Sequence, residues 1–351
     1  MAKGVSLLKA IIYHGPEDVR LEDWAKPEIN DNEVLVRVKV FAVCGSDVRT
    51  IRKGSSQAKP PVIMGHEFAG DIAEVGRNVE GLKTGDRAAS IPWVFCGKCY
   101  YCRSGRYDLC ENFNVFGHNL NGAFAEFVKI PEEVIARRGI IKISDLISYE
   151  EAALAEPLSC CLNGVLHSNV KVGNNVVVMG AGPIGLFHVQ LCRLVGASKI
   201  ISVDLIEKRL NCARELGADA TINIRKENLA EKIRVFTDGR GADTVIVAVG
   251  KVEAIKQGIE VLGRGGTLNI FGGVPPDSTL TIDPNWVHRK QTIITGSVNA
   301  TPAIYENAMN LIEAGRIKVK PLIDRKFKIE EFMKAVDITE TGECLKAFIR
   351  L

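Results

Sequence analysis

Alternating apolar and polar positions mark the first part of the chain. Residues 33–40 (EVLVRVKV) alternate as a half-buried strand does. Residues 68–75 and 123–130 predict two more strands, and turn sequences at 75–78 (VGRN) and 83–86 (KTGD) punctuate them. This pattern predicts a partly closed β structure with long loops up to about residue 155.

Apolar runs alternate with amphipathic stretches in the second part. The run 176–179 contains no polar position, which is typical of a strand covered on both faces. Strands that alternate with helices predict parallel βαβ units and a doubly wound sheet. Helices are predicted at 150–166, 183–195, 207–216, 229–236, 254–262 and 303–313, and strands at 176–179, 199–203, 221–224, 243–249, 267–271 and 291–296.

The two patterns predict an α/β protein with two domains, which a length of 351 residues accommodates. The β-rich domain is expected over residues 1–157 and the doubly wound domain over 158–298. Residues 299–351 are expected to return to the first domain.

Composition excludes several classes of protein. Net charge is only +3, and the basic residues are interspersed with acidic ones, so no nucleic-acid-binding patch is predicted. Glycines and Pro183 interrupt the most apolar stretch, 176–195, which therefore does not predict a membrane span. Ten cysteines, and an N-terminal sequence without the pattern of a signal peptide, favour a reducing, cytoplasmic location.

Four cysteines form the most informative motif. Cys96, Cys99, Cys102 and Cys110 are separated by two, two and seven residues. Four thiolates at such spacing suit zinc as a closed, structural shell, which leaves no open position for chemistry. An iron–sulfur cluster also takes four thiolates, but nothing else in the chain indicates electron transfer. We predict a structural zinc lobe at about residues 93–113.

A glycine-rich turn follows the buried strand 176–179 and opens a predicted helix. It reads Gly180-Ala181-Gly182-Pro183-Ile184-Gly185, the GxGxxG pattern of a dinucleotide site. The first glycine makes the turn, the second admits a pyrophosphate and the third allows close packing of helix on strand. The helix N-terminus offers free N–H groups to the phosphates.

Asp204 lies 19 residues beyond Gly185, at the end of the next predicted strand. A carboxylate there accepts hydrogen bonds from the ribose hydroxyls and repels a 2′-phosphate, which favours NAD over NADP. An arginine close to this carboxylate favours NADP instead, but Arg209 lies about a helical turn into the next element. Val249, Gly273 and Val298 end or follow late strands, and we expect them to line the nicotinamide pocket.

A second group of residues carries the chemistry of a reactive metal site. Cys44, His66, Glu67 and Glu156 offer a thiolate, an imidazole and carboxylates. A catalytic zinc needs such ligands together with one exchangeable position, and it can then lower the pKa of an alcohol. Ser46 is predicted to pass the proton outward.

These motifs together resemble the zinc-dependent medium-chain dehydrogenases, close to their sorbitol (polyol) and threonine dehydrogenase branch. The resemblance implies a GroES-like catalytic domain, a Rossmann coenzyme domain, and a homo-oligomer, either a tetramer or a dimer. It implies that Cys44, His66 and Glu67 hold the catalytic zinc and that Glu156 is a fourth ligand or a water-mediated neighbour. It rests on residues 44–47 (CGSD), 65–67 (GHE) with Gly70, 85–87 (GDR), the four cysteines, 156–159 (EPLS), and 180–185 with Asp204.

Arg49 departs from this family pattern. Many relatives carry a histidine five residues after the zinc-binding cysteine, where it completes a proton relay. Arginine stays protonated and cannot shuttle protons at neutral pH. We expect Arg49 to contact the coenzyme pyrophosphate or, as an alternative, a substrate phosphate.

The sequence therefore predicts an enzyme that oxidises a secondary alcohol of a polyol, cyclitol or sugar derivative reversibly to a ketone, with zinc and NAD. L-Threonine or another amino alcohol is the second hypothesis, and a sugar phosphate the third. A non-catalytic NADH-binding zinc protein is a further possibility, because a fold does not guarantee its usual function. A zinc-free quinone reductase is disfavoured by Cys44 and by the four-cysteine motif.

Overall fold

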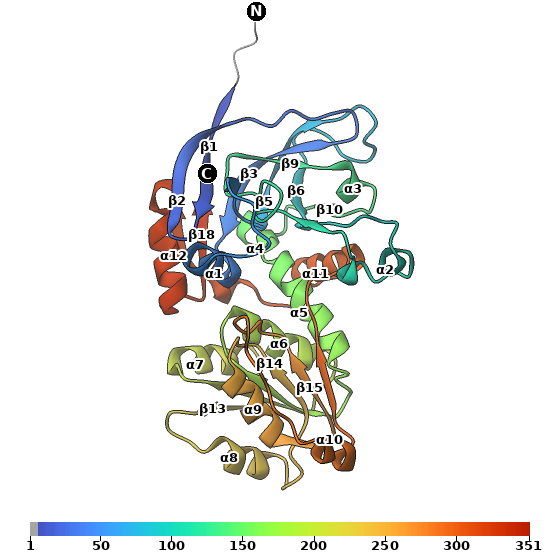
Figure 1. The fold of residues 1–351 in the computed structure, drawn as a ribbon, viewed down its shortest axis with the longest axis vertical. Helices are drawn as coiled ribbons and strands as arrows, with labels where there is room; N and C mark the ends of the chain where they lie inside the picture. Colours follow the sequence, from blue (N-terminus) through green and yellow to red (C-terminus); the bar gives the residue numbers. More distant parts are fainter. Residues whose placement is uncertain (1–5) are drawn as a thin grey trace, which may run out of the picture. The chain divides into compact units, whose positions relative to one another are not determined.

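The computed structural model describes residues 6–351. They form two compact units (Figure 1). The first unit extends through Pro157 and resumes at Ala300–Gly315 and Val319–Leu351. The second comprises Leu158–Asn299 with Arg316–Lys318. The chain thus leaves the first unit once, builds the second, and returns.

A seven-stranded sheet forms the centre of the first unit. Its order is β10-β6-β5-β3-β18-β17, and β9 also pairs with β3. Smaller sheets join β2-β1-β4 and β7-β8. The strands are β1 (Leu7–Gly15), β2 (Asp18–Ala25), β3 (Val34–Ala42), β4 (Val62–Ile63), β5 (Glu67–Val75), β6 (Arg87–Ser90), β7 (Trp93–Val94), β8 (Asn114–Val115), β9 (Phe127–Ile130), β10 (Ile140–Lys142), β17 (Ile323–Lys328) and β18 (Lys346–Arg350).

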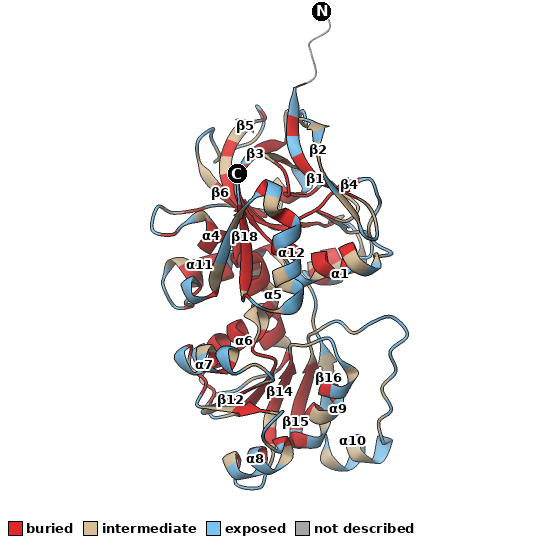
Figure 2. Ribbon diagram, turned by 90° about the vertical axis from the view of Figure 1, so that its left-hand side faces the viewer, coloured by how far each residue is buried: buried red, intermediate tan, exposed pale blue. Residues whose placement is uncertain are grey.

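The helices of the first unit are short. They are α1 (Gly45–Lys53), α2 (Tyr100–Arg103), α3 (Glu132–Ile135), α4 (Tyr149–Ala153), α11 (Pro302–Glu313) and α12 (Phe332–Thr341). A further helix, α5 (Ala155–His167), begins in this unit and continues into the second. In Figure 2 the central strands of the unit are largely buried, and the exposed positions lie mainly on helices and loops.

The second unit is a doubly wound α/β fold, as predicted. Its six-stranded sheet is parallel throughout, in the order β13-β12-β11-β14-β15-β16. The strands are β11 (Asn175–Met179), β12 (Lys199–Asp204), β13 (Ala220–Asn223), β14 (Ala242–Val247), β15 (Leu262–Ile270) and β16 (Ile293–Gly296). The helices are α6 (Pro183–Leu194), α7 (Glu207–Glu215), α8 (Leu229–Phe236), α9 (Val252–Val261) and α10 (Pro284–Lys290).

The strand order creates a switch point beside β11. The chain moves from β11 to β12 and β13 on one side, and then to β14, β15 and β16 on the other. Every residue of β11 is buried, which explains its continuous apolar run. Ligands of open α/β sheets bind at the carboxyl ends of the strands where the order reverses.

Three local expectations were wrong. The strand predicted at 123–130 forms a ladder only over Phe127–Ile130. The single helix predicted at 150–166 is divided into α4 and α5, and Leu154 is the C-cap of the first. Helix α1 was not predicted, although it follows Cys44 directly.

No helix within residues 6–351 is long and apolar enough to cross a membrane.

Candidate active site

Strand register brings three of the predicted metal ligands together. In the ladder between β3 and β5, Ala42 faces Glu67, so Cys44, two residues past the end of β3, lies near the start of β5. His66 immediately precedes β5. The ligand atoms of Cys44, His66 and Glu67 all lie within 4.8 Å of one another. Residues 22 positions apart in the chain thus meet at one end of the sheet.

Helix α1 shapes the thiol end of this cluster. Cys44 is the N-cap of α1, where the positive end of the helix dipole favours a thiolate. Asp47, the third helical residue, reaches back so that its Oδ2 accepts a hydrogen bond from the Cys44 N–H at 2.9 Å. Its Oδ1 lies 3.3 Å from Nδ1 of His66. One buried carboxylate thereby contacts two predicted ligands, an arrangement that holds metal-binding side chains in position.

Lys346 supplies a cation beside the third ligand. Its Nζ donates to Oε1 of Glu67 at 2.7 Å and lies 2.6 Å from Oε2. Both side chains are buried. Burial alone would lower the pKa of Lys346, but the nearby Glu67 carboxylate and Cys44 thiol raise it above its ordinary value. Lys346 therefore remains charged and neutralises Glu67.

The donor set and its surroundings fit a zinc ion. Sulfur, imidazole nitrogen and carboxylate oxygen are the atoms that zinc takes as ligands. The three ligand atoms also lie within 4.8 Å of one another, which is close enough for them to share one ion. Cys44, His66 and Glu67 are thus the residues that would hold zinc here.

Three other predicted residues lie around this cluster. Ser46 is half-buried in the first turn of α1, and Arg49 is exposed one turn further on. Glu156 is buried near the start of α5 but lies outside the group of three whose ligand atoms converge. Burial and the Glu156 carboxylate both raise the pKa of Tyr305. The Glu156 carboxylate also contributes to the raised pKa of Lys346, the partner of Glu67, so it lies close enough to act on the cluster electrostatically.

The four cysteines of the predicted lobe also converge. All four Sγ atoms lie within 4.8 Å of one another, with Cys96 3.5 Å from Cys110 and 3.9 Å from Cys102. Thiolates around a tetrahedral zinc, at a Zn–S distance of about 2.3 Å, lie about 3.8 Å apart. Backbone N–H groups of Lys98 and Cys99 lower the pKa of Cys96 to about 6. The lobe therefore fits a closed structural zinc site.

The glycine-rich turn of the second unit has the geometry of a phosphate cradle. Gly180 has φ +99°, a conformation that favours glycine. A Cβ on Gly185 would lie 1.7 Å from the carbonyl oxygen of Gly180, so only glycine allows the helix to approach the strand. Gly182 is the N-cap of α6, and Pro183 and Ile184 form its first turn. The free N–H groups of this helix face the switch point.

Asp204, the last residue of β12, is tied to the same turn. Its Oδ2 accepts a hydrogen bond from Ala181 N at 2.6 Å, and its Oδ1 accepts from Leu205 N and Ile206 N. These bonds hold the carboxylate beside the glycine-rich turn, where the adenosine ribose of a dinucleotide would lie. Arg209 approaches the turn as well, because its Nη1 lies 4.0 Å from the place of a Cβ on Gly182.

The remaining predicted coenzyme residues lie at or after the carboxyl ends of β14, β15 and β16. Val249 packs on Gly180, where its Cγ1 would be 2.5 Å from an added Cβ. The carbonyl oxygen of Gly273 lies 2.2 Å from the place of a Cβ on Gly250. Val298 is exposed and follows β16. All three lie near the edge of the sheet at which the sequence placed them.

Three residues near the metal ligands received no role of their own from the sequence. Asp47 belonged only to the CGSD motif, and Lys346 lies 279 positions from its partner Glu67. The third is His118, whose Nδ1 is buried and whose ring lies beside that of His66, with centroids 6.3 Å apart. The sequence contains one signal for such a role: Lys346 is a charged residue within the apolar segment 344–349 (CLKAFI).

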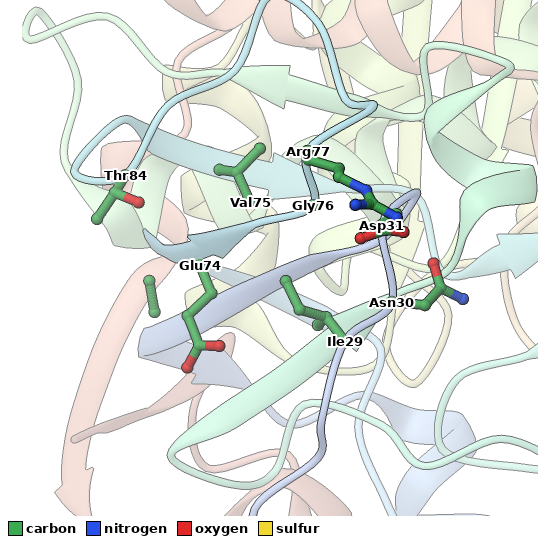
Figure 3. Close-up of a pocket in the computed structure, with 9 residues that line it drawn as sticks. Ile29, Asn30, Asp31, Glu74, Val75, Gly76, Arg77 and Thr84 are labelled. Carbon is green, nitrogen blue, oxygen red and sulfur yellow. Dashed lines mark ion pairs between the residues drawn. The ribbon is translucent and has the colours of Figure 1, made fainter.

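A hollow of about 460 Å³ lies elsewhere in the first unit (Figure 3). Its wall is formed by residues before β3, by the end of β5 and by the turns that follow β5. Two of the lining residues form an ion pair, with Arg77 Nη2 2.5 Å from Asp31 Oδ2. Its lining residues are Ile29, Asn30, Asp31, Ala73, Glu74, Val75, Gly76, Arg77 and Thr84. None of them is a predicted site residue, so this hollow is distinct from the metal cluster.

Comparisons with known proteins agree with both sites. Residues 30–140 match the family described as alcohol dehydrogenase GroES-like domain, and residues 183–314 match zinc-binding dehydrogenase. Sorbitol dehydrogenase of Bacillus subtilis is 32% identical over 348 residues, which cover 97% of each chain. L-Threonine 3-dehydrogenase of Caldanaerobacter subterraneus is 35% identical over 356 residues, covering 98% of this chain and 99% of the other.

Solved structures share the whole architecture. A zinc-binding dehydrogenase from Sinorhizobium meliloti, bound to NADP, superposes with a TM-score of 0.93 at 30% identity, covering 99% of this chain and 100% of that one. An alcohol dehydrogenase from Escherichia coli, complexed with NADH, has a TM-score of 0.90 at 27% identity, with coverage of 99% and 100%. Relatives of this fold thus bind either form of the coenzyme.

Proposed function

The chain belongs to the zinc-binding medium-chain dehydrogenases, and we propose that it uses NAD to oxidise a secondary alcohol of a polyol, cyclitol or sugar derivative to a ketone. The observation that carries this proposal is the convergence of Cys44, His66 and Glu67 within 4.8 Å. A non-catalytic protein of this fold would have no need to keep the three donors together.

Each residue of the cluster has a defined task in this reaction. Cys44, His66 and Glu67 would hold the zinc, whose Lewis acidity would lower the pKa of the alcohol, and a bound nicotinamide coenzyme would supply the hydride acceptor. Oγ of Ser46, two residues from Cys44 on α1, receives the alcohol proton and passes it toward solvent. Asp47 holds Cys44 and His66 in position relative to each other, and Lys346 balances the negative charge of Glu67.

A polyol is favoured over an amino alcohol by the motifs CGSD and EPLS, at residues 44–47 and 156–159. L-Threonine is the second candidate because a relative with that activity in its name is 35% identical to this chain. A threonine-binding site must anchor a carboxylate and an ammonium group, whereas a polyol requires only hydroxyl partners.

A substrate panel combined with metal analysis tests the proposal. Purified protein is assayed for NADH formation with sorbitol, inositols, sugar phosphates and L-threonine, and zinc is counted per chain. We expect turnover of a polyol or cyclitol and about two zinc ions per chain. Turnover of L-threonine alone would replace the polyol assignment with the second candidate. Coenzyme binding without turnover of any alcohol would refute the enzymatic proposal.

The preference for NAD is tested separately at Asp204. The Asp204→Asn variant removes the charge that repels a 2′-phosphate. Its single amide oxygen can still accept from Leu205 N and Ile206 N, but its amide nitrogen cannot accept from Ala181 N as Oδ2 does. We expect the ratio of kcat/KM with NADP to kcat/KM with NAD to rise roughly 10- to 100-fold, since like charges in contact cost several kcal/mol. Asp219→Asn, which removes a carboxylate that pairs with Arg193 in the same unit, is the matched control. An unchanged ratio in Asp204→Asn would show that another residue selects the coenzyme.

A further inference from the structure

We propose that His118 binds the substrate, by a hydrogen bond between its imidazole and a hydroxyl next to the reacting carbinol group. The inference rests on the proposed function and extends it, because it names the residue that distinguishes a diol or polyol from a simple alcohol. Its starting point is the position of His118 beside His66, with ring centroids 6.3 Å apart.

The backbone around His118 is fixed to the segment that carries His66. Gly122 N donates to Ile63 O at 2.7 Å, and Ala123 N donates to Gly65 O at 3.0 Å. The side chain of Asn121 accepts from Ile63 N at 3.1 Å. These bonds hold the loop against residues 63–65, which directly precede His66. The backbone of the fold therefore sets where the imidazole of His118 lies.

Close packing of glycines brings this loop near the metal cluster. A Cβ on Gly117 would lie 2.6 Å from Gly65 N, and one on Gly122 would lie 2.2 Å from Gly65 O. Side chains at either position would push the loop away from His66. Lys59 N also donates to the carbonyl oxygen of His118 at 2.9 Å, which holds the other side of the loop.

One nitrogen of the imidazole has no partner among the described residues. Nδ1 of His118 is buried and has no hydrogen bond to any of the described residues, while the side chain as a whole is only partly covered. Leaving a buried polar group without a partner is costly, so a site that contains one gains when a ligand supplies the bond. A second substrate hydroxyl is such a ligand, because hydroxyl groups both donate and accept.

The role differs from that of the neighbouring acids. Asp47 is already engaged by Cys44 and His66, and Glu67 by Lys346. His118, with its Nδ1 unpaired among the described residues, is therefore available to a second, neutral hydroxyl beside the one that Ser46 serves. A site built to bond a substrate hydroxyl discriminates strongly against the analogue that lacks it. His118 thus determines specificity, while the reacting hydroxyl belongs to the zinc ligands.

The test compares 2,3-butanediol with 2-butanol, which differ by the second hydroxyl. In His118→Ala we expect kcat/KM for 2,3-butanediol to fall roughly 10- to 100-fold, mainly through KM, and kcat/KM for 2-butanol to change less than about threefold. His118→Asn, whose amide donates and accepts, should recover part of the diol preference. His118→Phe fills the volume without a hydrogen bond and should behave as the alanine variant does.

His14→Ala is the matched control, since His14 lies in the same unit and pairs with Glu22 rather than with the cluster. It should leave the diol preference unchanged. An equal loss with both alcohols in His118→Ala and recovery by His118→Phe would show that the ring only packs against His66, and would overturn the inference. An unchanged diol preference in all His118 variants would do the same. Failure of the unaltered protein to oxidise any alcohol is a different result, which refutes the proposed function itself.

Discussion

The Cys44→Ala variant is expected to lose one of about two zinc ions per chain and to lower kcat at least 1,000-fold, or about 4 kcal/mol. Cys44 is the proposed sulfur ligand and caps helix α1, so its removal leaves only His66 and Glu67 of the three convergent donors. The four-cysteine lobe is built from other residues and should keep its metal. Zinc per chain is measured by elemental analysis and kcat by NADH formation.

Cys212→Ala is the control for this experiment. Cys212 lies on α7 in the second unit and belongs to neither convergent group. Its variant should retain both the zinc content and the turnover of the unaltered protein. If Cys44→Ala kept its full zinc content and its activity, the cluster of Cys44, His66 and Glu67 would not be the reactive centre.

The Lys346→Met variant is expected to be less stable than the unaltered protein by about 3–5 kcal/mol in the presence of a chelator. Methionine matches the length of the lysine stem but leaves the buried Glu67 carboxylate without its cation. Added zinc should reduce this difference, because a bound cation neutralises Glu67 in place of Lys346. Urea unfolding midpoints, measured with chelator and with zinc, provide the comparison.

Two further variants separate charge from packing. Lys346→Arg keeps the positive charge and should lose much less stability. The double variant Glu67→Gln with Lys346→Met removes both charges, and it should recover much of the stability that Lys346→Met alone loses. A Lys346→Met protein that unfolds at the same urea concentration as the unaltered one, with or without zinc, would show that the ion pair contributes nothing to folding.

The sequence predicted the second unit better than the first for a physical reason. In this doubly wound fold most strands pair with the strand that comes next in the chain, except at the switch point between β11 and β14, and buried strands alternate with amphipathic helices. Helix α8 was predicted with the bounds that the structure has, Leu229–Phe236, because its apolar periodicity is unambiguous. The doubly wound fold and its glycine-rich turn were therefore readable from local pattern alone.

The first unit depends more on contacts between distant segments. Strand β9 was predicted too long because the residues before it bond mainly to other segments than β3. Residues 123 and 124 bond to the segment before His66, and residues 124–126 bond to β1. The division of the helix over 150–166 had a sequence signal that the prediction did not use. Pro157 lies in the first turn of α5, where the missing N–H of a proline is tolerated, whereas it would disrupt one continuous helix. Helix α1 carries Val48, Thr50 and Ile51 in nine residues, a composition that weakens the helical signal.

The metal ligands were predictable by type, but their environment was not. Cys44, His66 and Glu67 were chosen for their donor atoms and family pattern, and the structure brings them together. The pairing of Lys346 with Glu67 could not be predicted from the sequence, because it depends on the pairing of β18 with β3, where Phe348 faces Ala42. His118 was missed because a loop histidine gives no local sign of the backbone bonds that place it beside His66.

The insertion of β18 between β3 and β17 has a consequence for the ancestry and engineering of this protein. The first unit is assembled from separated stretches of sequence. A continuous fragment that ends before β18 would leave an edge of β3 unpaired, so this unit cannot be exchanged or expressed as one piece. Nearly all of the second unit is a single stretch, Leu158–Asn299. Recombination between relatives can therefore replace the coenzyme-binding part as a cassette, whereas the alcohol-binding part must change residue by residue.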